Sequence, residues 1–271
     1  MSLVQTDWLE ENINDVKIID CSWHMPKVKR DSFEEYKNNH IPNTIFFDLD
    51  DNSNKDTNLP HMLVKISVWE KIVSKMGIKK DDKIIIYDNS DVISSCRCWF
   101  NFIYFGHDPK LVHVLNGGLK KWMKEKRKIT TNFTNIKNSN YKSFEKKELV
   151  KDKYLIDQNI INNKFKVIDA RSRERFNGNV PEPRKGLRSG NIKNSFCVPF
   201  DYCLNKDKTF KSKDELKIVF KTCLKNIDEK DVVFSCGSGV TACVLALAYS
   251  LINDKYHPSI YDGSWAEYGM I

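Results

Sequence analysis

The sequence lacks any long hydrophobic run. No apolar stretch approaches the ~20 residues that a membrane-spanning helix needs, and the start, Met1-Ser-Leu-Val-Gln-Thr-Asp-Trp8, lacks the basic and then apolar pattern of a secretory signal. Hydrophobic residues nevertheless make up 41% of the 271 residues, which supplies a core for one large or two ordinary domains. We therefore expect a globular protein without membrane partners and a cytoplasmic location.

The eight cysteines lack regular spacing. No two of them form a C-x-x-C pair, so neither a disulfide framework nor a zinc site is expected; they stand at positions 21, 96, 98, 197, 203, 223, 236 and 243. A reducing compartment would keep them as thiols. We expect most of them to be small core residues, with Cys96 and Cys98 partly exposed. No metal or organic cofactor is implied.

The charged residues form no stripe of a single sign. The formal charge is +8, but 44 Lys and Arg are interspersed with 36 Asp and Glu, as in Glu145-Lys-Lys-Glu148. This mixing indicates a solvated surface and no nucleic-acid partner. A mildly positive field would still attract small anionic substrates.

The two halves of the chain are related by an internal repeat. Lys17-Ile-Ile-Asp20-Cys-Ser22 recurs as Lys166-Val-Ile-Asp169-Ala-Arg171, and Lys83-Ile-Ile-Ile-Tyr-Asp88 corresponds to Asp231-Val-Val-Phe-Ser-Cys236. Apolar runs alternate with helical segments, which predicts an α/β fold whose two tandem domains each have a parallel sheet with helices on both faces. The predicted helices include 67–76, 98–105 and 213–223. The predicted domains are 1–129 and 148–271, joined by an aperiodic linker at 130–147.

The most informative segment runs from Val232 to Ala242, where an apolar strand leads into a cysteine, a glycine loop and a helix predicted over 242–250. The loop N–H groups and the positive end of the helix would converge on the Cys236 sulfur, so we expect a thiolate with a lowered pKa. Gly237 and Gly239 allow the loop to curl until its amides turn inward. The segment predicts a loop that holds an anion.

Four interpretations of this loop compete. A tyrosine-phosphatase loop would need arginine six positions after the cysteine, and position 242 is alanine. A dinucleotide fingerprint fits G-x-G-x-x-A with Asp262 further on, but that fold needs several more strands, and the sequence given stops at Ile271. Sulfur transfer needs only amides around a small anionic persulfide. A buried structural cysteine remains the other alternative, and the loop alone does not separate these two.

The loop Cys236-Gly-Ser-Gly-Val-Thr-Ala242 resembles the active-site loop of the two-domain rhodanese superfamily, in its 3-mercaptopyruvate sulfurtransferase form. Other segments resemble that family too, and together they span nearly the whole chain: 20–26, 40–50, 61–63, 116–122, 181–184 and 261–265.

The resemblance implies an enzyme that moves sulfur from 3-mercaptopyruvate, through a Cys236 persulfide, to thioredoxin, a small thiol or cyanide, and releases pyruvate. Neutral Gly237 and Ser238 imply mercaptopyruvate as the preferred donor. The alternatives are a thiosulfate sulfurtransferase and a non-catalytic binding module. The first copy has Asp88 where the second has Cys236, so it is expected to be non-catalytic.

The resemblance also assigns roles to individual residues. Arg175 and Arg184 would bind the donor, because a guanidinium can grip a carboxylate through two parallel bonds. The alternative is that each is a surface arginine paired to Glu174 or Glu182. Besides the nucleophile Cys236, the implied catalytic residues are a proton relay of Ser238, Asp50 and His61. The further implied substrate-binding residues belong to the loop and are Gly237, Gly239, Val240 and Thr241.

Overall fold

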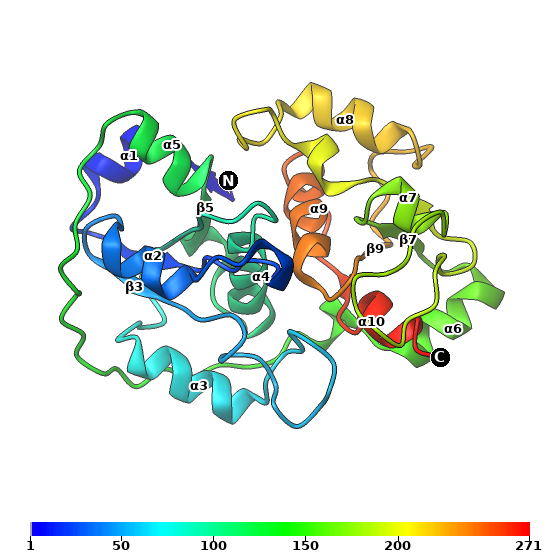
Figure 1. Cartoon of the computed structure of the whole chain (residues 1–271), viewed down its shortest axis with the longest axis horizontal. Helices are drawn as coiled ribbons and strands as arrows, with labels where there is room; N and C mark the ends of the chain where they lie inside the picture. Colours follow the sequence, from blue (N-terminus) through cyan, green and yellow to red (C-terminus); the bar gives the residue numbers. More distant parts are fainter. Residues whose placement is uncertain (1) are drawn as a thin grey trace. The chain divides into compact units, whose positions relative to one another are not determined.

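The computed structural model describes residues 2–271 and divides into two compact units. Unit 1 consists of the chain up to Ser53, Val64–Lys146 and Lys206–Thr209. Unit 2 consists of Asn54–Leu63, Lys147–Asn205 and Phe210–Ile271. The two units are described separately below, and Figure 1 labels their elements.

Unit 1 contains a five-stranded parallel sheet with the strand order β1-β5-β4-β2-β3. Its strands are β1 (Leu3–Val4), β2 (Lys17–Asp20), β3 (Thr44–Phe46), β4 (Ile84–Tyr87) and β5 (Val112–Leu115). Its α-helices are α1 (Thr6–Glu11), α2 (Ser32–Asn38), α3 (Ile66–Lys75), α4 (Ser95–Tyr104) and α5 (Gly118–Lys124).

Unit 2 repeats this arrangement with the order β6-β10-β9-β7-β8, again with all strands parallel. Its strands are β6 (Val150–Lys151), β7 (Lys166–Asp169), β8 (Phe196–Cys197), β9 (Val232–Ser235) and β10 (Ile260–Tyr261). Its α-helices are α6 (Lys153–Asn162), α7 (Arg173–Phe176), α8 (Lys213–Lys221), α9 (Val240–Ser250) and α10 (Ser264–Tyr268). The identical strand order agrees with the duplication predicted from the sequence.

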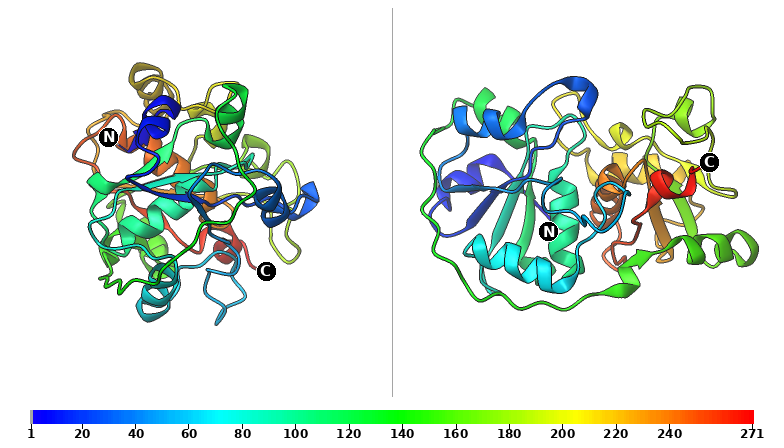
Figure 2. Two further views of the ribbon diagram at one scale, coloured as in Figure 1. Left: turned by 90° about the vertical axis from the view of Figure 1, so that its left-hand side faces the viewer. Right: turned by 60° about the horizontal axis from the view of Figure 1, so that its bottom comes forward.

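Helices cover both faces of each sheet (Figure 2). In unit 1, Leu9 of α1 and Trp122 of α5 pack with Ile85 of β4, and successive side chains of a strand point to opposite faces. On the other face, Trp69 of α3 stacks on Phe105 with ring centroids 4.8 Å apart. In unit 2, α6 and α10 share one core cluster with β7 and β9, whereas Phe220 of α8 packs against Tyr249 of α9. The predicted α/β fold is therefore confirmed.

The predicted helices are present with shifted ends. Helix α8 begins after a capping box in which Ser212 and Glu215 bond each other's backbone N–H groups, a motif that fixes a helix start. Helix α4 begins at Ser95, three residues before the predicted start. The segment between Thr130 and Lys147 has no regular structure, and Ser139 and Lys146 tie it to unit 1 through hydrogen bonds to the carbonyls of Ser74 and Tyr104.

One expectation about the cysteines is wrong. Cys96 and Cys98 are fully buried, because every residue of α4 is buried, whereas Cys197 and Cys223 are the partly exposed ones. All eight cysteines are free thiols.

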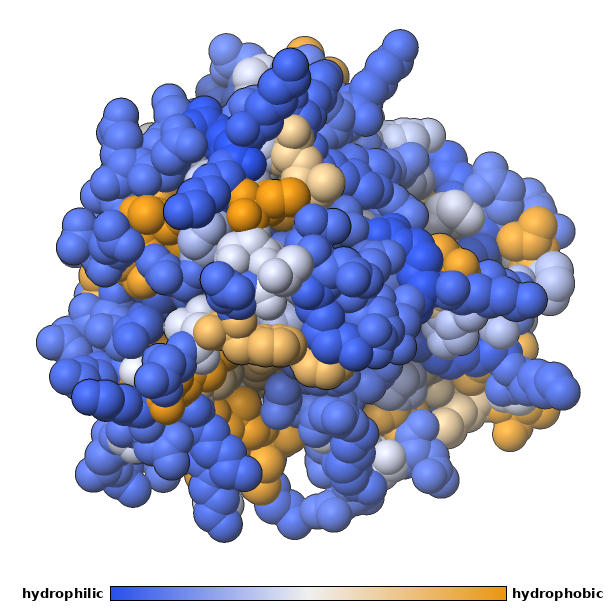
Figure 3. Space-filling view, turned by 60° about the vertical axis from the view of Figure 1, so that its left-hand side comes forward, coloured by the Kyte–Doolittle hydropathy of each residue, from blue (hydrophilic) through white to orange (hydrophobic). Residues whose placement is uncertain are grey.

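The surface is mostly polar on the face that Figure 3 shows, where hydrophobic residues form small separate patches. Within residues 2–271, no helix has the length and hydrophobicity of a membrane span.

Candidate active site

Cys236 lies between β9 and α9, directly after the last residue of the strand. Its side chain is buried, with the residue 2% exposed. Gly239 adopts a left-handed conformation (φ +76°) at the start of α9, which glycine tolerates best. The first N–H groups of a helix have no acceptor within the helix, so the start of α9 can offer donors to an anion bound beside it. The strand, cysteine, loop and helix follow the predicted order.

Ser264 supports this loop from α10. Its hydroxyl oxygen accepts the N–H groups of Cys236 at 3.1 Å and of Gly239 at 3.2 Å, and the hydroxyl donates to the carbonyl of Tyr261. Ser264 has φ +50°, an uncommon conformation for a residue other than glycine. Ser264 lies in the family-like segment 261–265, but no motif in the sequence marks it as a functional residue.

Both predicted substrate arginines lie beside the loop. A side chain at Gly237 would meet Nη2 of Arg175 at 3.2 Å and Nη1 of Arg184 at 3.7 Å, so glycine leaves room for both guanidinium groups. Arg184 also donates from Nη2 to the Ser238 hydroxyl at 3.3 Å. The cationic groups of this site therefore come from the segment around α7, and position 242 contributes a fully buried alanine.

One of these arginines also forms the ion pair that was the alternative to substrate binding. Arg175 donates to the Glu182 carboxylate from Nε at 3.2 Å and from Nη2 at 2.6 Å. Arg175 therefore makes this ion pair and lies beside Gly237 of the loop at the same time.

His61 lies against Ser238. The segment Asn54–Leu63 belongs to unit 2, and the Leu63 N–H bonds the Asp262 carboxylate at 2.9 Å. Nδ1 of His61 is 3.0 Å from Oγ of Ser238. Because Arg184 already donates to that oxygen, the serine hydrogen can point toward His61, where the imidazole nitrogen can accept it.

The remaining predicted residues take different places. Asp50 belongs to unit 1, where its carboxylate accepts the indole N–H of Trp23 at 2.9 Å, and its part in a relay stays a prediction. Val240 and Thr241 form the first turn of α9, with Val240 buried and Thr241 half-buried. Among residues 2–271, no group of three or more His, Cys, Asp or Glu could hold a metal ion.

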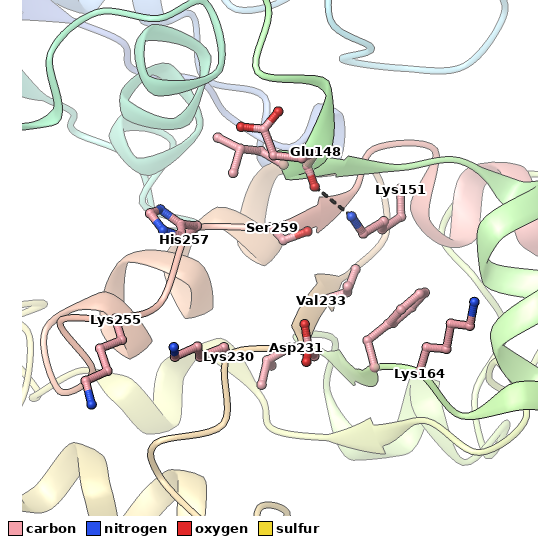
Figure 4. Close-up of a pocket in the computed structure, with 12 residues that line it drawn as sticks. Glu148, Lys151, Lys164, Lys230, Asp231, Val233, Lys255, His257 and Ser259 are labelled. Atoms are coloured by element: carbon pink, nitrogen blue, oxygen red, sulfur yellow. Dashed lines mark hydrogen bonds between the residues drawn. The ribbon is translucent and has the colours of Figure 1, made fainter.

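A separate pocket of about 650 Å³ lies at the opposite edge of the same sheet (Figure 4). Lys230 and Asp231 at the amino end of β9 help to line it, whereas Cys236 follows the carboxyl end of that strand. Its lining contains no cysteine and no arginine. This pocket therefore offers no thiol to a ligand.

Comparison with known proteins agrees with this geometry. The rhodanese-like domain family matches residues 5–125 and 153–270, and the chain belongs to that family. A thiosulfate/3-mercaptopyruvate sulfurtransferase of Arabidopsis thaliana is 36% identical, with 98% of this chain and 75% of that protein covered. A 3-mercaptopyruvate sulfurtransferase of Mus musculus is 34% identical, with 99% and 92% covered.

The crystal structure of SseA from Escherichia coli, described as a 3-mercaptopyruvate sulfotransferase, superposes with a TM-score of 0.87 at 31% identity. It covers 98% of this chain and all of that one. The protein is a sulfur-transferring enzyme, which confirms the predicted class of reaction. The donor is a separate question, because the Arabidopsis protein carries both donors in its name.

Proposed function

We propose that this protein transfers sulfur from 3-mercaptopyruvate to a thiol acceptor through a persulfide on Cys236. The observation that carries the proposal is the placement of two guanidinium groups, those of Arg175 and Arg184, beside Gly237 of the cysteine loop. Mercaptopyruvate has a carboxylate next to a ketone. Two cationic forks beside the nucleophile match these two groups.

In the first half-reaction, the Cys236 thiolate attacks the sulfur of the donor. A sulfur–sulfur bond forms and the carbon–sulfur bond of the donor breaks, with its electron pair leaving on carbon as the enolate of pyruvate. The proton of the donor thiol is transferred to that carbon, which yields pyruvate and an anionic persulfide. The 3.0 Å contact between His61 and Ser238 supports the transfer of this proton through that pair.

In the second half-reaction, an acceptor thiolate attacks the outer sulfur of the persulfide and Cys236 leaves as thiolate. N–H groups of the loop and of the first turn of α9 stabilise both anionic states. We propose thioredoxin or a small thiol as the acceptor, and the cytoplasm as the location, because eight free cysteines suit a reducing compartment.

Thiosulfate is the alternative donor, because two arginines can also bind an inorganic dianion. The test compares kcat/KM for 3-mercaptopyruvate and for thiosulfate with cyanide as the common acceptor, so that only the donor changes. We expect a large preference for mercaptopyruvate. Arg184→Ala should lower kcat/KM for mercaptopyruvate by roughly 10- to 100-fold, the loss typical of a charge-assisted contact.

Arg173→Ala is the matched control, because Arg173 belongs to the same helix as Arg175 but lies over the ring of Tyr202, and it should leave turnover unchanged. Mass spectrometry after donor addition should show one extra sulfur atom on Cys236. Preference for thiosulfate would overturn the proposed donor. An active enzyme that never carries the extra sulfur would overturn the covalent scheme, and inactivity with both donors would favour a binding module.

A further inference from the structure

Glu182 is a buried carboxylate between two arginines. Its side chain is 1% exposed, and its oxygens accept from Nη1 of Arg171 at 2.8 Å and from Nε and Nη2 of Arg175 at 3.2 and 2.6 Å. A carboxylate this deeply buried is stable only when such donors compensate for its lost hydration. Glu182 therefore connects the loop-facing arginine to the interior of unit 2.

Arg171 anchors the other end of this connection. Its guanidinium donates to both oxygens of Asp169 at the end of β7, and also to the Gly190 carbonyl at 2.8 Å. It lies over the indole of Trp265, 4.3 Å from the ring centroid. Arg171 is fully buried and held on every side, so it fixes the position of Glu182.

The position of Arg175 depends on this chain of contacts. Arg175 is only partly buried, and its guanidinium pairs with the buried Glu182 carboxylate. Glu182 holds the edge formed by Nε and Nη2, and Nη2 also lies 3.2 Å from a side-chain position at Gly237. Bidentate binding of a carboxylate depends on such a fixed guanidinium plane.

Glu182 also sets the charge of the site. Asp169, Arg171, Glu182 and Arg175 alternate in sign and their formal charges cancel, so Glu182 offsets the positive charge that Arg175 brings to the loop. An added positive charge lowers the electrostatic energy of a bound dianion about twice as much as that of a monoanion at the same distance, because the Coulomb energy scales with the product of the charges. A site of low net charge therefore favours a singly charged ligand.

We propose that Glu182 is a positioning and specificity-determining residue, which orients Arg175 and matches the site to a sulfur donor with one carboxylate in preference to an inorganic dianion. This inference rests on the proposed function, since it concerns the donor of the same reaction. Arg171 and Asp169 act through Glu182 as its support.

The test is Glu182→Gln, which removes the charge but keeps the shape and one acceptor oxygen. We expect KM for 3-mercaptopyruvate to rise about 10-fold with a smaller change in kcat, because the carboxylate of the donor then meets an Arg175 guanidinium that is no longer held in one orientation. We expect kcat/KM for thiosulfate to stay constant or to rise. The ratio of the two kcat/KM values should therefore fall at least 10-fold.

Glu174→Gln is the matched control, since Glu174 is an exposed carboxylate on the same helix as Arg175, and it should leave the ratio within twofold of wild type. Both donors are measured on one preparation, so the fraction of folded enzyme cancels in the ratio. An unchanged ratio in Glu182→Gln would overturn the inference while leaving the proposed function intact. A wild-type enzyme without preference for mercaptopyruvate would overturn the proposed function instead.

If Glu182→Gln does not yield folded protein, Glu182→Asp keeps the charge and withdraws the carboxylate by one methylene group. KM for mercaptopyruvate should then rise several-fold while that for thiosulfate stays within twofold. Equal changes for both donors would show a merely structural role.

Discussion

The two units place different residues at the same point of the same fold. The residue after the central strand is Asp88 in unit 1 and Cys236 in unit 2. The Asp88 carboxylate accepts the N–H groups of Ser90 at 2.8 Å and of Ser95 at 2.9 Å, so a side chain of the chain itself fills the ring of donors. In unit 2 a thiol stands there. The first loop is therefore stabilised by its own carboxylate, whereas the second loop carries a thiol at the same position.

The residue that faces this loop differs as well. The N–H of Leu119 bonds the Asp88 carbonyl as that of Trp265 bonds the Cys236 carbonyl, so Gly118 and Ser264 are equivalent. Both have positive φ, +56° and +50°. A side chain at Gly118 would come within 2.4 Å of the Asp88 carbonyl, whereas the Ser264 hydroxyl binds two loop amides. Unit 2 supports its loop from outside because no carboxylate supports it from within.

The largest effect is expected for Cys236→Asp, which gives the loop of unit 2 the residue that unit 1 has at the same position. We expect turnover to fall by about 10³-fold or more, because the carboxylate cannot carry sulfur. The measurement is the steady-state rate with 3-mercaptopyruvate and cyanide. Cys223→Ser, which changes another thiol of unit 2, should stay close to wild type. Retention of more than a tenth of the activity in Cys236→Asp would show that another residue accepts the sulfur.

A second test concerns the serine two positions after each of these residues. Ser90 donates to the backbone carbonyl of Trp23 at 2.5 Å, a group that takes up no proton, whereas Ser238 lies beside an imidazole. His61→Asn should lower kcat by about 10- to 100-fold, the usual scale of general acid–base catalysis, with little effect on KM. Asparagine suits the site, because His61 has φ +62° and asparagine tolerates that conformation.

The control for this variant is His257→Asn, which alters an exposed histidine of the lysine-rich pocket in Figure 4 and should leave kcat unchanged. An unaltered kcat in His61→Asn would exclude the proton relay while leaving the persulfide scheme in place.

The third test concerns Ser264, whose equivalent in unit 1 is Gly118. Ser264→Ala leaves two loop N–H groups without their acceptor and should cost about 1–3 kcal/mol of stability, with a several-fold loss of turnover. Ser264→Gly loses the same bonds but relieves the positive φ, so it should be more stable than the alanine variant by about 1 kcal/mol. Thermal unfolding measures both. Equal stability of wild type and Ser264→Ala would contradict the supporting role of this hydroxyl.

Much of this arrangement could be predicted from the sequence, because it depends on local pattern. The repeated Lys-x-Ile-Asp motif places Asp20 and Asp169 at the ends of β2 and β7, and the strand–cysteine–glycine order places Cys236 before α9. The resemblance also indicated the arginines that lie beside the loop. These features are written in consecutive residues or in short motifs.

Other features depend on packing and were missed. The Ser-Cys-Arg-Cys start of α4 looks half-polar, yet Arg97 and both neighbouring cysteines are fully buried. The proposed role of Glu182 depends on Arg171. The guanidinium of Arg171 in turn lies over the indole of Trp265, which belongs to α10. The sequence shows an acid near an arginine, but only the fold shows that the acid points inward.

The last test concerns the aspartates of the repeat, Asp20 and Asp169. Arg171 binds Asp169, whereas the Asp20 carboxylate accepts hydrogen bonds from the uncharged N–H and hydroxyl groups of Ser22. Burial raises the pKa of Asp20 to about 7. The native state then holds a proton that the unfolded chain has already lost above its ordinary pKa near 4. The contribution of Asp20 to stability is therefore complete below pH 4 and is lost as the pH rises to about 7.

Asp20→Asn keeps the acceptor oxygen and removes this titration. We expect the stability of wild type relative to the variant to fall between pH 5 and pH 7, by about 1 kcal/mol per pH unit, without a change in turnover. Denaturant unfolding across that range measures the difference. In Asp169→Asn the same substitution leaves Arg171 with one carboxylate fewer in a buried site, so it should destabilise the protein throughout the range. Parallel pH profiles of wild type and Asp20→Asn would show that Asp20 is ionised in the native state over this range, which would contradict the raised pKa.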